Sequence, residues 1–177
     1  MNIQEQITLI DELDLEPIKV KLTHPKEGPG WTLQHADLAE KVYKRFLTLN
    51  LKYPDRPHVP SHDMDIFWHY HILDTMKYAE DCDLIFGRFL HHFPYLGLRG
   101  EQDAARLQHD WENMKALYEA EFGDKIAATA QTSGDDGPEV CGPDPDSCTP
   151  TPSCEEAFPS QNRLRPRPFR VLAAQVT

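Results

Sequence analysis

A change in composition after Lys125 most constrains what this chain can fold into. Eight of the fifteen prolines lie between residues 131 and 168, where few aliphatic side chains remain to offset the entropy of ordering the backbone. We therefore predict that residues 127–177 form a disordered tail rich in proline and cysteine. Residues 1–126 are enough for one helical domain with a single core, but too few for two typical domains.

Apolar residues recur at helical spacing in four parts of residues 1–126. Thr32 is a suitable N-cap for one of these segments, and Gly123 is suited to end another. Residues 16–30 contain three prolines and two glycines, so we predict a loop there, with a short extended piece around residues 18–22. The result is an all-α fold, a small bundle of three to four helices. The predicted helices are residues 2–13, 33–51, 62–86 and 101–122.

The formal net charge of −11 argues against binding to nucleic acid, because phosphates would repel the chain. The basic cluster in residues 163–170 is interrupted by two prolines and cannot form a helical basic face. The N-terminal residues lack the basic and apolar parts of a secretory signal, and no apolar run approaches the ~18 residues of a membrane span. We therefore expect a cytoplasmic protein with no membrane association.

Unusual polar residues gather in the predicted helix of residues 62–86, between the N-cap candidate Ser61 and the terminating Gly87. Residues three, four and seven apart share a helix face, so one polar line contains His62, Asp65 and His69. Bulky apolar residues flank it, and polar groups that become buried must be hydrogen-bonded or bound to a ligand. The second polar line contains His71, Asp74, Tyr78 and Cys82.

Imidazole and carboxylate groups together suit a divalent metal such as zinc or iron. We predict Asp65, His69 and His91 as metal ligands, with His91 folding back after Gly87. His69 and His71 point about 200° apart on a helix, so they are not expected to bind one ion. The alternative is a structural hydrogen-bonded network without metal. The remaining members of the ligand or polar network are His62, His71, Asp74, Tyr78, Cys82 and His92.

The spacing Asp65-x-x-Trp68-His69-x-His71, followed by Tyr78, Cys82 and Phe86-Gly87, resembles the glycine-rich domain-containing protein-like family of plants and bacteria. The resemblance covers roughly residues 32–95. It implies that His69, His71, Tyr78 and Cys82 belong to a shared family pattern, without supplying an activity. The chain lacks the glycine-rich region of the plant members, so the resemblance implies no RNA-related role.

Three functions fit these features. The first is a small intracellular binding or accessory domain, in which the histidine cluster holds a divalent metal or a small polar ligand. The second is a metal-dependent oxygenase or hydrolase, with Asp65 and His69 as ligands and His71 or Tyr78 moving a proton. The third is an interaction module that binds a protein partner through tail residues 127–177, or a peptide-modification substrate that acts through this cysteine-bearing tail. The tail cysteines are Cys141, Cys148 and Cys154.

Overall fold

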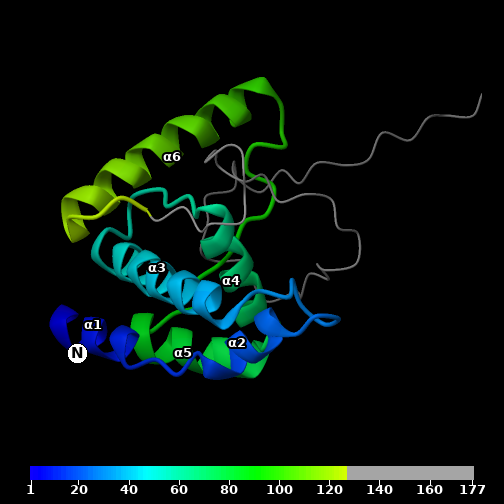
Figure 1. Ribbon diagram of the computed structural model, residues 1–177. Helices are drawn as coiled ribbons and strands as arrows, with labels where there is room; N and C mark the ends of the chain where they lie inside the picture. The colour runs from blue at the N-terminus through cyan, green and yellow to red at the C-terminus, as the bar shows by residue number, and fades with distance from the viewer. Residues whose placement is uncertain (127–177) are drawn as a thin grey trace, which may run out of the picture.

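The computed structural model describes residues 1–126, and these residues form six helices and no strand (Figure 1). The prediction of an all-α fold is confirmed, whereas the predicted number of three to four helices is too low. The predicted tail of residues 127–177 and its three cysteines lie outside the described residues. The helices are α1 (Ile3–Asp11), α2 (Glu16–Thr23), α3 (Leu33–Lys52), α4 (His62–Leu73), α5 (Thr75–Phe86) and α6 (Glu101–Phe122).

Helix α3 is the central element of the fold. It contacts α1, α2 and α4, while α5 packs against α1 and α4. In Figure 1, α1, α2 and α5 lie on one side of α3 and α6 lies on the other. The side chains of Val42, Tyr43 and Phe46 in α3 are buried, as the apolar stripe of residues 33–51 predicted. This helix therefore supplies the core surface on which α4 is placed.

Helix α2 corrects the prediction of a loop at residues 16–30. Pro17 lies in the first turn, where a helix tolerates proline because the missing N–H has no intrahelical partner there. Leu15, Ile18 and Leu22 are almost completely buried at spacings of three and four residues. Burial of this short apolar stripe against α3 and α4 stabilises the helix, although prolines and glycines in and around the segment favour a loop.

The predicted helix of residues 62–86 is two helices, which meet at Asp74. Asp74 leaves the helical conformation (φ −82°, ψ 73°), and its carboxylate accepts a hydrogen bond of 3.4 Å from the Lys77 backbone N–H, so it caps α5. The chain turns at this residue and α5 packs against α4. Tyr78 and Cys82 therefore lie beside α4 and not further along its axis. Gly87, in the left-handed conformation (φ 63°), ends α5 as predicted.

Loss of the cap at Asp74 is expected to destabilise the fold. Asp74→Ala removes the side-chain acceptor for the first turn of α5 and should lower the free energy of unfolding by about 1 kcal/mol. Urea denaturation followed by circular dichroism measures this change. Glu80→Ala, at an exposed position within the same helix, is the matched control and should change stability by less than about 0.5 kcal/mol. Equal effects of the two substitutions would contradict the capping role.

Helix α6 is attached to α3 through its C-terminal half. The Arg45 guanidinium donates to the Tyr118 hydroxyl at 3.1 Å and lies 4.8 Å from the centre of the Phe122 ring. Lys52 forms an ion pair with Glu121. Trp111, Met114 and Tyr118 are buried along one side of α6, as their spacing predicted for residues 101–122.

None of the six helices in residues 1–126 combines the length and the apolar character that crossing a membrane requires. The expected cytoplasmic location stays a prediction.

Candidate metal centre

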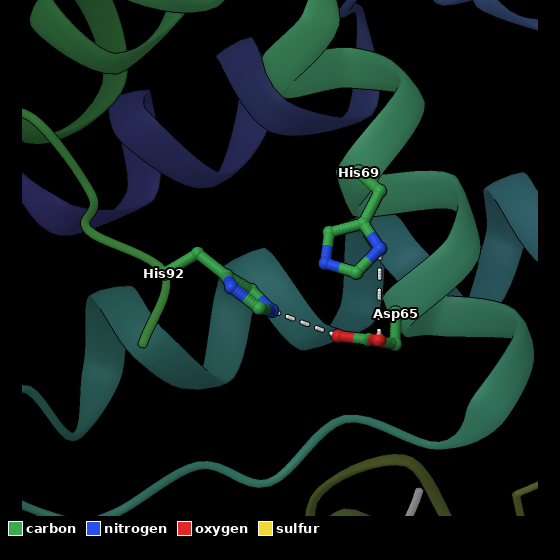
Figure 2. A group of neighbouring side chains, drawn as sticks. All are labelled: Asp65, His69 and His92. Carbon is green, nitrogen blue, oxygen red and sulfur yellow. Dashed lines mark hydrogen bonds and ion pairs between the residues drawn. The ribbon is translucent and has the colours of Figure 1, made fainter. Parts of the chain in front are cut away.

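Three of the sequence-predicted polar residues converge at one place, where α4 meets the loop that follows α5 (Figure 2). Asp65, His69 and His92 each offer one ligand atom, and these three atoms all lie within 4.8 Å of one another. The Asp65 carboxylate accepts a hydrogen bond of 2.9 Å from His92 Nε2, and its other oxygen lies 3.8 Å from His69 Nδ1. The two imidazole rings lie 4.6 Å apart, centre to centre.

Helical spacing places two of these side chains. Asp65 and His69 are four residues apart on α4, so they lie one above the other on the same face. His92 comes from the loop and approaches Asp65 from the opposite side, as Figure 2 shows. One helix face and one loop residue therefore form the cluster, which agrees with the predicted fold-back of the chain after Gly87.

The structure brings His92, and not the predicted ligand His91, to the carboxylate of Asp65. The His91 ring lies 5.0 Å from the Phe89 ring, and burial lowers the pKa of His91. Adjacent loop residues point in different directions, and the backbone conformation that decides between them is not visible in the sequence. The prediction of His91 as a metal ligand is therefore not supported by the geometry, because the histidine that offers a ligand atom beside Asp65 and His69 is His92.

Two side chains of the cluster are nearly buried, and the third is partly exposed to solvent. The side chains of Asp65 and His92 are each 10% exposed, whereas that of His69 is 36% exposed. Burial lowers the pKa of His69, an effect that the nearby Asp65 carboxylate opposes. A lowered pKa keeps the imidazole neutral at pH 7, which is the form that binds metals.

The distances between the ligand atoms can be compared with those around a bound zinc ion. Zinc binds imidazole nitrogen at about 2.0–2.1 Å in tetrahedral geometry, so its ligand atoms are about 3.3 Å apart. The distances of 2.9 Å to His92 and 3.8 Å to His69 run from different oxygens of the Asp65 carboxylate. One ligand atom of each residue lies within 4.8 Å of the others, so the side chains would have to adjust their positions around a bound ion.

A buried hydrogen-bonded chain lies next to the cluster. The Trp68 indole Nε1 donates to the Tyr78 hydroxyl at 2.8 Å, and that hydroxyl donates to the Leu90 carbonyl oxygen at 2.5 Å. Burial raises the pKa of Tyr78 well above its usual range, so the hydroxyl keeps its proton and stays a donor. Burial also raises the pKa of Cys82, which indicates an inert thiol in place of a nucleophile.

His71 belongs to a separate buried network. Its Nδ1 lies 3.0 Å from the Tyr43 hydroxyl, and its Nε2 lies 2.9 Å from an Asp81 carboxylate oxygen that also pairs with Lys77. His71 is 1% exposed, and burial lowers its pKa despite the neighbouring Asp81. The sequence assigns His71 to a polar network without identifying Tyr43 or Asp81. Tyr43 lies in another helix, and a single helix over residues 62–86 would place Asp81 ten residues further along the axis, whereas the break at Asp74 brings it beside His71.

The remaining predicted residues lie outside the cluster of three ligand atoms. His62 is a half-buried residue in the first turn of α4, and Asp74 is the exposed cap of α5. The sequence also gives no indication of another histidine–carboxylate pair, in which His35 Nε2 lies 3.2 Å from Asp63 Oδ2. No spacing rule connects residues on two different helices, so this pair carried no signal in the sequence.

Stability is expected to decrease when the pH falls below about 6.5, the usual pKa of an unfolded histidine. The folded-state pKa of His71 is lowered, so its stabilising effect is complete above about pH 6.5 and is lost as the pH falls towards the folded value. Urea denaturation at about pH 7.5 and about pH 5.5 should give a lower midpoint at the acidic pH.

In the His71→Gln variant, the change of midpoint between the two pH values should be smaller. The carboxylates and the ammonium group around His71 stay in place in this variant: Asp74, Lys77 and Asp81. A wild-type midpoint that is constant or rises on acidification would contradict a neutral, buried His71.

Residues 1–126 thus form an all-helical domain with a histidine–carboxylate cluster between a helix and a loop. The sequence matches the UCP032817-like family over residues 5–120, more than half of the 177-residue chain, so the protein belongs to the UCP032817-like family. The expected membership of a glycine-rich domain-containing family is therefore wrong. Comparison with curated proteins and with solved structures finds no match.

Proposed function

We propose that this protein is a small binding or accessory domain that holds a divalent metal ion, zinc or iron, on Asp65, His69 and His92. The supporting observation is the convergence of three ligand atoms within 4.8 Å from two separate chain segments. Two imidazoles and one carboxylate are a donor set that both metals accept. An ion there would replace the proton that His92 Nε2 now shares with the Asp65 carboxylate.

Metal content is the first test of the proposal. The full chain, purified without chelator, should contain about one equivalent of zinc or iron by elemental mass spectrometry, or bind one equivalent when it is supplied. Binding to the folded state alone should raise the thermal midpoint. Less than about a tenth of an equivalent, together with an unchanged midpoint after addition of zinc, iron and copper, would leave only a structural hydrogen-bonded network.

Catalysis by the bound ion is a second candidate, which the donor set favours. Catalytic zinc sites keep three protein ligands and an open position, and two histidines with one carboxylate are the ligands of non-haem iron oxygenases. The 36% exposure of His69 leaves one side of the cluster open to solvent. A metal-dependent hydrolase or oxygenase would need such an opening for its substrate.

An exogenous ligand distinguishes an open coordination position from a closed one. Azide added to the cobalt-loaded full chain should change the visible absorption spectrum if solvent occupies a position on the ion. A spectrum that azide leaves unchanged would remove the enzymatic candidate and leave the binding function.

A further inference from the structure

Of the three clustered residues, His92 is the one whose position no helix determines. Asp65 and His69 are fixed by α4, whereas His92 lies in the irregular segment between α5 and α6. The position of a loop side chain depends on its own tertiary contacts and on those of the neighbouring loop residues. The contacts of the residues just before His92 therefore contribute to whether its imidazole reaches Asp65.

Leu90, two residues before His92, is held by two side chains of α5. The Tyr78 hydroxyl donates to the Leu90 carbonyl oxygen at 2.5 Å, and the Cys82 thiol lies beside the Leu90 backbone. Tyr78 and Cys82 are four residues apart, so they lie on the same face of α5. Leu90 is 6% exposed, which means that its carbonyl oxygen has no ready substitute in water if the hydrogen bond from Tyr78 is lost.

Trp68 connects this contact to the metal ligands. Its indole N–H donates to the Tyr78 hydroxyl at 2.8 Å, so that hydroxyl is oriented towards Leu90 by a donor from α4. The ring of Trp68 also meets the ring of His92 edge to face at 4.6 Å. The residue after Trp68 is the ligand His69, so one stretch of α4 contributes both to the cluster and to the support of the loop.

We propose that Tyr78 is a positioning residue for the metal centre, which fixes His92 over Asp65 through its hydrogen bond to the Leu90 carbonyl. This inference rests on the proposed metal-binding function. It assigns a role to the buried tyrosine that core packing alone does not require, because a phenylalanine would fill the same space. Outer residues that orient metal ligands affect metal affinity by about 10-fold to 100-fold.

Zinc titration of the full-length Tyr78→Phe variant tests the proposal. The Kd for zinc should increase about 10-fold relative to the wild type, and the cobalt absorption spectrum should change because His92 is displaced. Tyr43→Phe is the matched control, since Tyr43 is equally buried but its hydroxyl contacts His71 and not the loop. Its zinc Kd should equal that of the wild type.

A double-substitution cycle separates positioning from a general loss of packing. If Tyr78 acts through His92, Tyr78→Phe should have no further effect on zinc affinity in a His92→Ala background. Equal penalties in both backgrounds would overturn the proposal, as would a Tyr78→Phe variant that binds zinc like Tyr43→Phe. Absence of binding of both zinc and iron by the wild type would instead overturn the proposed function itself.

Cys82→Ala provides a second variant if Tyr78→Phe fails to fold. It removes the other α5 side chain that contacts the Leu90 backbone and leaves the Tyr78 hydroxyl intact. The expected result is a smaller increase in the zinc Kd, about 2-fold to 5-fold, that again disappears in the His92→Ala background. An unchanged Kd would contradict the role of the Leu90 contacts in placing His92.

Discussion

Asp65→Ala is expected to weaken zinc binding on the order of 100-fold or more, because it removes the one residue that both imidazoles approach. Without the carboxylate, His92 loses its hydrogen-bond acceptor and the ion loses its anionic ligand. Isothermal titration of the full chain with zinc measures the change. Asp65→Asn keeps the shape of the side chain and should recover only part of the affinity, since a neutral amide is a weaker ligand.

Asp63→Asn is the matched control for that substitution. Asp63 is a buried carboxylate in the same first turn of α4, but it lies next to His35 and not next to His69 or His92. Residues two apart point to opposite sides of a helix, so zinc affinity should stay within about 2-fold of the wild type. Equal losses in Asp63→Asn and Asp65→Asn would contradict the assignment of the ligands.

Trp68→Ala is expected to lower the free energy of unfolding by about 3–5 kcal/mol. Trp68 is 5% exposed and lies 5.1 Å from the Phe46 ring of α3, so truncation leaves a large cavity between α3 and α4. It also removes the donor to Tyr78. Small domains are stable by only about 5–15 kcal/mol, so urea denaturation should show a partly unfolded population at low denaturant.

Trp68→Phe separates the two contributions of Trp68. Phenylalanine keeps most of the apolar volume but has no N–H, so stability should fall by about 1–2 kcal/mol. The zinc Kd should increase more than this loss of stability alone explains, because the Tyr78 hydroxyl is no longer oriented towards Leu90. A loss below about 1 kcal/mol in Trp68→Ala would show that the indole does not contribute to the core as described.

The sequence predicts most of the helices because their signals are local. Apolar spacing and capping residues correctly locate α3 and α6, and Gly87 correctly ends α5. The short helix α2 was missed because its stability depends on burial against α3 and α4, which no local pattern records. The break at Asp74 was missed because an aspartate within a continuous polar line can be a surface residue or a cap, and only the turn of the chain decides.

The sequence predicts the two members of the site that share a helix face, but not the residue that the loop contributes. Helical spacing pairs Asp65 with His69, and in the structure Asp65 Oδ2 lies 3.8 Å from His69 Nδ1 (Figure 2). The third member, His92, and the partners of His71 depend on contacts between separate elements. Such contacts follow from tertiary packing, so the sequence could name a region for the loop ligand without choosing between His91 and His92.

The most direct test of the metal centre is anomalous diffraction at the zinc absorption edge, from crystals of the full chain grown with zinc. A single strong peak is predicted between Asp65, His69 and His92, about 2.0–2.2 Å from one carboxylate oxygen and from one nitrogen of each imidazole. Zinc bound elsewhere on the chain, with His92 Nε2 still hydrogen-bonded to Asp65, would contradict the proposed centre.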